Sequence, residues 1–157
     1  MSTDKTWEIV SNSLEDTFRL AEKIGQRLKG GEVIELASDI GGGKTAFVRG
    51  LATGIKSSDQ VASPTFTISR HYRAAEGDLV IHHFDFYRLN EDPGLMKAEI
   101  AESTGSPGVV TVVEWADSIA DVLPEDRLKV EIISTGEDSR HIRFLCGKDH
   151  QHLEVQE

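Results

Sequence analysis

A glycine-rich loop between two apolar segments constrains the fold of this chain more than any other feature. The loop covers Ser38–Thr45 and reads S-D-I-G-G-G-K-T. Before it, Glu32–Ala37 is short and partly β-branched, which indicates a strand. After it, Ala46–Ala52 repeats apolar side chains at the spacing of one helix face. The order strand, glycine loop, helix predicts a layered α/β domain.

The end of this loop matches the phosphate-binding signature G-x-x-x-x-G-K-[ST], whereas Ser38 replaces its first glycine. The three glycines before Lys44 let backbone N–H groups approach phosphate oxygens, because no Cβ is in the way. Lys44 can neutralise phosphate charge, and Thr45 offers a hydroxyl to magnesium at a helix start that favours anions. The loop therefore predicts an ATP and magnesium site. The alternative is a flexible glycine turn with a surface lysine.

Two acidic residues lie near the ends of predicted strands. Asp85 lies near the end of Leu79–Phe86, and Glu114 near the end of the valine-rich segment Val109–Trp115. If these strands are parallel neighbours of the strand before the loop, both carboxylates converge on Lys44 at one edge of the sheet. Magnesium prefers one or two carboxylates with phosphate and water oxygens, which these residues can supply. Two solvated charges at strand ends are the alternative.

Thr65 lies in the segment S-P-T-F, which follows the predicted loop helix after a polar stretch. Its hydroxyl could reach a γ-phosphate or the attacking water, as switch loops do in nucleotide-binding proteins. An ordinary proline turn before a strand would give the same pattern.

Three other residue types favour structural interpretations. His82 and His83 are adjacent, so in a strand they point to opposite faces and make a poor metal-binding pair. Trp115 is expected to pack rather than to stack on a base. Cys146 is expected to be a buried strand residue, because a single cysteine allows no internal disulfide.

The remaining patterns complete one α/β domain. Ser13–Asp16 resembles a capping box, and apolar residues then recur at helical spacing as far as Leu28. We also predict strands at Phe66–Tyr72, Leu79–Phe86, Val109–Trp115, Arg127–Ile133 and His141–Cys146, a helix at Pro93–Glu102 and a hairpin turn at Ser134–Asp138. The fold class expected is a three-layer, P-loop NTPase-like domain with a mixed, partly parallel central sheet. A single domain over residues 1–157, with a core at about 8–146, is expected.

The charge and the N-terminus restrict partners and location. With 17 basic and 27 acidic residues the formal net charge is −10, which disfavours broad binding to nucleic acid or to anionic lipid. The N-terminus has no basic segment followed by an apolar one, and no apolar run approaches the roughly 18 residues of a membrane span. We therefore expect a cytoplasmic protein without membrane contact.

Four ordered motifs carry a family resemblance over roughly Ser13 to Arg140: S-D-I-G-G-G-K-T, V-A-S-P-T-F, H-F-D-F-Y-R-L and V-E-W. This order resembles the TsaE (YjeE) family, whose members serve tRNA threonylcarbamoyladenosine synthesis. The resemblance implies an ATPase that works with the TsaB–TsaD pair, of which TsaD transfers threonylcarbamoyl to an adenosine in tRNA. ATP turnover would reset that complex.

The resemblance also implies roles for particular residues. Lys44 would contact the phosphates, Thr45 and Glu114 would hold magnesium, Asp85 would take a Walker-B-like role, and Thr65 would belong to the switch loop. The catalytic set expected is Lys44, Thr65, Asp85 and Glu114. The nucleotide-binding set expected is Leu14, Asp39, Ile40, Gly41, Gly42, Gly43, Lys44, Thr45, Ala46, Asp85, Ser139 and Arg140. The departures from the family pattern are Ser38 for a usual glycine, Gly42 for a usual alanine and a loose match over Asp92–Ser103.

Several functional alternatives remain open at this level. A small-molecule kinase could use the same loop, although we identify no arginine-rich lid or acceptor pocket in the sequence. An ATP-dependent binding module without hydrolysis is the second alternative. Either Asp85 or Glu114 could orient the attacking water. Arg88 and Arg140 are candidates for an arginine finger, and a partner protein is another possible source.

Overall fold

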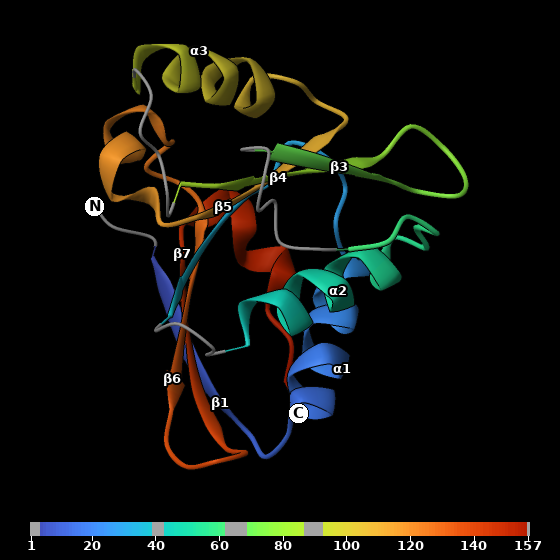
Figure 1. Ribbon diagram of the computed structural model, residues 1–157, viewed down its shortest axis with the longest axis vertical. Coiled ribbons are helices and arrows are strands. Elements are labelled where there is room, and N and C mark those ends of the chain that lie inside the picture. The colour runs from blue at the N-terminus through green and yellow to red at the C-terminus, as the bar shows by residue number, and fades with distance from the viewer. Residues whose placement is uncertain (1–3, 39–42, 62–68, 87–92, 157) are drawn as a thin grey trace.

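The computed structural model describes residues 4–38, 43–61, 69–86 and 93–156 (Figure 1). Within these residues a seven-stranded sheet has the order β1-β7-β6-β2-β5-β4-β3. Its strands are β1 (Lys5–Ser11), β2 (Val33–Ser38), β3 (Ser69–Arg73), β4 (Val80–Asp85), β5 (Val109–Glu114), β6 (Leu128–Ser134) and β7 (Arg140–Cys146). The helices are α1 (Leu14–Gly25), α2 (Lys44–Gly54), α3 (Pro93–Thr104) and the 3₁₀ helices η1 (Ala116–Val122) and η2 (Lys148–Leu153).

The sheet is parallel at its centre and antiparallel at both sides. Strands β6, β2, β5 and β4 are parallel neighbours, so their carboxyl ends lie at one edge. On one side β7 and β1 add antiparallel strands, and on the other β3 pairs antiparallel with β4. The predicted mixed, partly parallel sheet is confirmed, as is the closing hairpin between β6 and β7. We call the edge with the parallel carboxyl ends the carboxyl edge, and the opposite one the amino edge.

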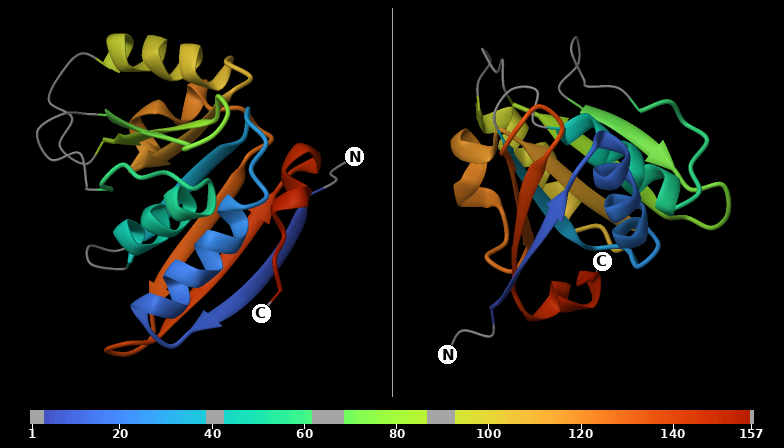
Figure 2. Two further views of the ribbon diagram at one scale, coloured as in Figure 1. Left: turned by 90° about the vertical axis from the view of Figure 1, so that its right-hand side faces the viewer. Right: turned by 90° about the horizontal axis from the view of Figure 1, so that it is seen from below.

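Helices cover both faces of the sheet, as predicted for a three-layer domain. Helices α1 and α2 lie side by side on one face, over a core that includes Ile24, Phe47 and Val112. Helix α3 and η1 cover the other face over a smaller core that includes Phe84 and Ile100. The right-hand view of Figure 2 shows η1 and the α1–α2 pair on opposite sides of the sheet.

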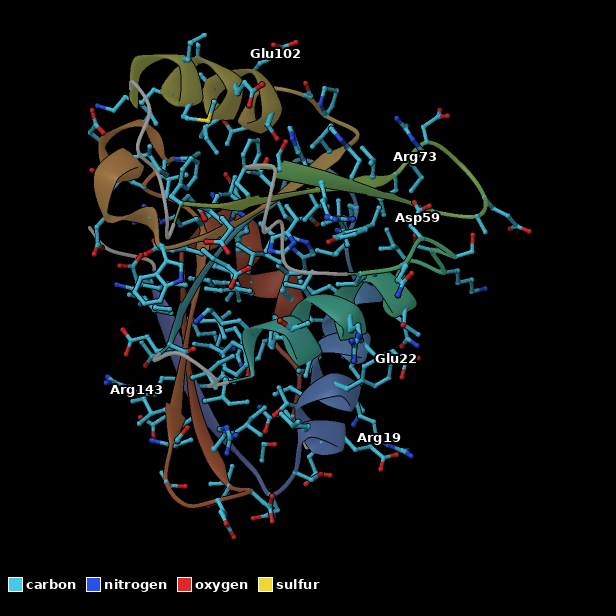
Figure 3. The ribbon with its side chains drawn as sticks, in the orientation of Figure 1. Arg19, Glu22, Asp59, Arg73, Glu102 and Arg143 are labelled. Carbon is cyan, nitrogen blue, oxygen red and sulfur yellow. The ribbon has the colours of Figure 1, made fainter. Side chains whose placement is uncertain are left out.

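Contact between α1 and α2 depends on a glycine. A Cβ added to Gly50 would lie 2.3 Å from the carbonyl oxygen of Phe18, so a larger residue would push the two helices apart. This contact packs the middle of α1 against the middle of α2. Charged side chains such as Arg19, Glu22 and Glu102 point outward from the helices (Figure 3).

The predicted cap of α1 is confirmed. The Ser13 hydroxyl accepts from the N–H of Asp16 at 3.0 Å, and the Asp16 carboxylate accepts from the N–H of Asn12 at 3.0 Å. The helix ends at Gly25, however, and the prediction that it continues to Leu28 was wrong. Residues 26–28 form a turn closed by backbone hydrogen bonds, in which Leu28 is still buried.

Two elements were missed in the sequence. Strand β1 pairs with β7 over its whole length, and η2 follows β7. The predicted end of the core near residue 146 was too early, because Leu153 and Val155 are buried in the same core as α1 and α2. Cys146 is buried in β7, as predicted, and burial raises the pKa of its thiol to about 11. Among the described residues no helix is both long and apolar enough to cross a membrane.

Candidate nucleotide-binding site

The first turn of α2 stands at the carboxyl edge, directly after the glycine loop. Gly43 is its N-cap residue and has φ +106°, a left-handed conformation that glycine adopts without strain. Because Gly43 has no side chain to cap the helix, the first-turn N–H groups of Lys44, Thr45 and Ala46 are suited to bind an anion. Thr45 is exposed. The predicted loop residues Asp39, Ile40, Gly41 and Gly42 lie outside the described residues.

The Lys44 ammonium bridges two neighbouring strand ends. Its Nζ donates to Ser38 Oγ at 3.0 Å and lies 4.9 Å from the centroid of the Trp115 ring. Ser38 continues β2 in register with Ile132, and its φ is not positive. The backbone therefore does not require glycine at position 38, and the serine hydroxyl becomes a partner of the loop lysine.

The two predicted carboxylates are brought together. Asp85 and Glu114 are Cα partners at the ends of parallel β4 and β5, and Leu36 of β2 pairs with Glu114 on its other side. Partners in a parallel register project from the same face of the sheet. Strands β2, β5 and β4 thus place Ser38, Glu114 and Asp85 at neighbouring strand ends along the carboxyl edge.

Glu114 is held by a hydrogen bond that the sequence did not reveal. Its Oε2 lies 2.5 Å from Nε2 of His83, and Nδ1 of His83 lies 3.2 Å from the Tyr72 hydroxyl. Exposure is 5% for Glu114 and 1% each for His83 and Tyr72, so water does not separate these groups. Asp85 is half-buried on the same strand as His83, two residues further on.

The neighbouring histidine behaves as the strand alternation predicts. His82 lies on the opposite face from His83, where its ring stacks on His71 at 4.0 Å and packs against Phe84 at 3.9 Å. Burial, reinforced by the nearby His71 and His83, lowers the pKa of His82 to about 4. The prediction that His82 and His83 point to opposite faces of the sheet is confirmed.

Strand β5 ends at Glu114, one residue before the predicted end at Trp115. The Trp115 φ of +58° is left-handed, which terminates the strand after Glu114 and starts η1. The indole packs against the core beneath α3, as expected, and it also lies under the Lys44 ammonium. Local sequence patterns did not reveal this second contact, because Lys44 and Trp115 are far apart along the chain.

The remaining site predictions fall partly on residues near this edge and partly outside the described residues. Leu14 lies beside the loop, since a methyl group added to Gly43 would be 3.6 Å from Leu14 Cδ2. Ser139 and Arg140 lie where β6 turns into β7 at the same edge, but the Arg140 guanidinium donates to the carbonyl of Ser139 at 2.9 Å. Thr65 and Arg88 are outside the described residues.

The oxygen donors at this edge suit magnesium. Thr45 offers a hydroxyl, and Asp85 and Glu114 offer carboxylates, all of which are hard ligands. Among the described residues no cluster of three or more His, Cys, Asp or Glu side chains could hold a metal. A metal at these carboxylates would therefore need further oxygen ligands, as magnesium obtains from nucleotide phosphates and water.

Comparison with known proteins identifies the family. Residues 11–142 match the family model of the threonylcarbamoyl adenosine biosynthesis protein TsaE. The Bacillus subtilis tRNA threonylcarbamoyladenosine biosynthesis protein TsaE is 39% identical over 135 residues, which cover 84% of this chain and 80% of that protein. The Aquifex aeolicus protein of the same name is 37% identical over 141 residues, covering 87% of this chain and 94% of that protein.

A solved structure agrees with these matches. The crystal structure of Bacillus subtilis YdiB aligns with a TM-score of 0.70 and 32% sequence identity, covering 98% of this chain and 93% of that one. The family model, the relatives and the fold all agree. The chain belongs to the TsaE family of tRNA threonylcarbamoyladenosine biosynthesis proteins.

Proposed function

We propose that this protein binds ATP with magnesium at the carboxyl edge and hydrolyses it in support of a TsaB–TsaD pair that forms threonylcarbamoyladenosine in tRNA. One observation carries the proposal. Parallel β5 lies between β2 and β4, so the end of β2 and the acids that end β5 and β4 share one edge of the sheet. A nucleotide in such α/β sheets binds at this edge.

Each side chain has a part in the proposed site. Lys44 neutralises phosphate charge, and the first-turn N–H groups of α2 donate to the phosphate oxygens. Thr45 and Glu114 hold magnesium, which when bound neutralises charge on the phosphate oxygens. The carboxylate that does not bind the metal directly orients the attacking water. Thr65 keeps its proposed place in the switch loop.

The charge of the chain supports a division of labour with partners. A formal net charge of −10 leaves the phosphate backbone of tRNA poorly matched to this surface. We therefore assign tRNA binding to the partner proteins and nucleotide turnover to this chain.

The test is ATP hydrolysis by the purified protein, alone and with TsaB–TsaD. Hydrolysis should be slow alone and should rise with the partners, and Lys44→Ala should remove the increase. Tight ATP binding with the same low hydrolysis in both conditions would contradict the proposal and favour a binding module without turnover. Transfer of the γ-phosphoryl group to a small acceptor rather than to water would indicate a kinase.

A further inference from the structure

A buried row of polar side chains crosses β3, β4 and β5 behind the candidate site. We infer that His83 is a positioning residue, which fixes the carboxylate of Glu114 in the orientation that binds magnesium, and that Tyr72 fixes His83 in turn. This inference rests on the proposed function, because it concerns how the proposed metal ligand is held.

The geometry of the row is specific. His83 lies between its two partners, with Nε2 2.5 Å from Glu114 Oε2 and Nδ1 3.2 Å from the Tyr72 hydroxyl. A carboxylate can only accept, so Nε2–H of His83 donates to Glu114. The Tyr72 hydroxyl can donate to Nδ1 when that nitrogen carries no proton and accept from it when it does. The imidazole ring therefore keeps the same orientation in both cases.

The hydrogen bond leaves part of Glu114 for a ligand. It engages Oε2, so Oε1 is the oxygen that we assign to magnesium. A glutamate side chain has several rotatable bonds, and holding it before the metal arrives reduces the entropy lost on binding. Partners behind a metal ligand act in this way, and their loss typically weakens metal binding about 10- to 100-fold.

Burial argues against an incidental contact. The face of the sheet around His83 is apolar, with Ile81 two residues earlier in β4 and Val112 as its partner in β5. Apolar side chains would fill this face without the desolvation cost of an imidazole and a carboxylate. The polar row is therefore best explained by what it does for Glu114.

Strand β4 supplies a matched control. His82 is the adjacent residue of the same type, and its ring contacts His71 and Phe84 rather than Glu114. A substitution at His82 perturbs the same strand and leaves the contact to Glu114 in place.

The experiment measures ATP affinity by calorimetry, first in excess chelator and then over a range of magnesium concentrations. His83→Leu should raise the magnesium concentration needed for half of the metal-dependent gain in affinity about 10- to 100-fold. Its affinity for metal-free ATP should equal that of the wild type. His83→Gln should recover much of the loss, because its amide N–H can replace Nε2–H, and His82→Leu should keep the wild-type requirement.

The outcomes separate the two proposals. A wild type that binds no ATP would overturn the proposed function, and the inference with it. Normal ATP binding with an unchanged magnesium requirement in His83→Leu would overturn the inference alone. If thermal unfolding shows that His83→Leu does not fold, Tyr72→Phe decides: a raised requirement supports the positioning role, and an unchanged one overturns it.

Discussion

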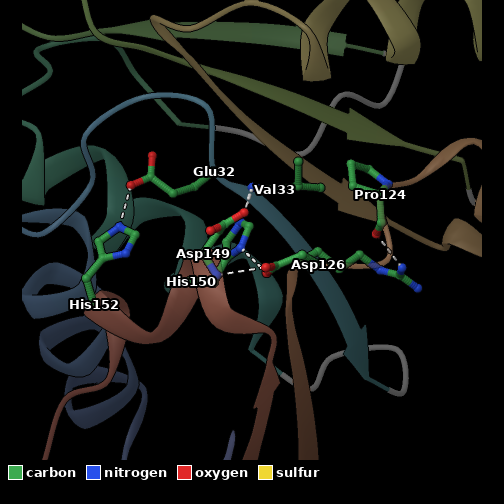
Figure 4. A network of polar contacts seen from close by, with 8 residues as sticks. Glu32, Val33, Pro124, Asp126, Asp149, His150 and His152 are labelled. Carbon is green, nitrogen blue, oxygen red and sulfur yellow. Dashed lines mark hydrogen bonds and ion pairs between the residues drawn. The ribbon is translucent and has the colours of Figure 1, made fainter. Parts of the chain in front are cut away.

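At each edge of the central sheet a buried histidine pairs with a carboxylate, and the surroundings of the two pairs differ. At the amino edge, His150 Nε2 accepts from the N–H of Val33 at 2.9 Å, and its Nδ1 donates to Asp126 at 2.8 Å (Figure 4). The second oxygen of Asp126 accepts from the N–H of Asp149 at 2.7 Å. Both ring nitrogens of His150 and both carboxylate oxygens of Asp126 are thus paired within the protein. This closed network fixes η2 to the start of β2.

At the carboxyl edge, the pair His83–Glu114 ends beside groups that solvent can reach. Thr45 is exposed, and Lys44 and Asp85 are only half-buried. The same pairing of imidazole and carboxylate thus stabilises one edge, and we propose that it orients a carboxylate for a ligand at the other. The comparison predicts that mutations at the amino edge change stability, whereas those at the carboxyl edge change nucleotide binding.

The largest effect is expected at Lys44. Lys44→Ala removes the charged donor to the phosphates and should weaken Mg–ATP binding by at least about 3 kcal/mol, roughly 100-fold. The measurement is the rise in melting temperature on adding Mg–ATP, which should disappear. Lys148→Ala, an exposed lysine in η2, is the matched control and should retain the rise. An undiminished rise in Lys44→Ala would refute the site itself.

The second effect tests the closed network. His150→Ala leaves the buried N–H of Val33 without its acceptor and should lower the free energy of unfolding by about 1–3 kcal/mol. Urea denaturation measures this change, and calorimetry should show unaltered ATP affinity. His141→Ala, in a partly exposed pair with Glu8, should cost no more than about 1 kcal/mol. If His150→Ala lost ATP binding but kept the stability of the wild type, the contrast between the two edges would be contradicted.

The third effect concerns acid stability at the amino edge. Burial raises the pKa of Glu32, but hydrogen bonds from His152 and from the N–H groups of Lys29 and Gly30 outweigh burial and hold that pKa below its ordinary value of 4.5. The resulting stability is present above the unfolded-state pKa and is lost as the pH falls through the folded-state pKa.

Glu32→Gln should therefore be less stable than the wild type at pH 7, by about 1 kcal/mol, and the difference should shrink below pH 4.5. Urea denaturation from pH 7 down to pH 3 would measure it. Glu102→Gln, an exposed carboxylate on α3, should change stability at pH 7 by less than about 0.5 kcal/mol. A difference that grows on acidification would be the wrong sign.

The smallest effect is expected at Ser38. Its hydroxyl accepts a hydrogen bond from Lys44 and so competes with a phosphate for that ammonium, and Ser38→Ala should therefore raise ATP affinity about 2- to 5-fold, equivalent to about 0.5–1 kcal/mol. Calorimetry can resolve this difference. Ser38→Gly also removes the hydroxyl and in addition increases the freedom of the backbone. If ATP affinity rises in Ser38→Gly but not in Ser38→Ala, the effect belongs to the turn rather than to the hydroxyl.

The sequence predicted features that depend on neighbouring residues. The cap of α1 at Ser13, the helix after the loop and the valine-rich β5 follow from local backbone preferences and hydrophobic pattern. The hydrophobic pattern also placed Asp85 and Glu114 near strand ends. That both lie at one edge of the sheet followed only from the assumption that the strands are parallel. Strand β1 was missed because its pairing with β7 stabilises it more than its own pattern does.

Only the tertiary structure decided which side chains meet. The contact from His83 to Glu114 joins residues 31 positions apart, and the contact from Val33 to His150 joins residues 117 apart. Such contacts depend on strand order and register, since a shift of one residue would turn His83 to the other face of the sheet. The sequence by itself therefore determined the loop, its strand and its helix, whereas the packed sheet decided that Tyr72, His83 and Glu114 form one row behind it.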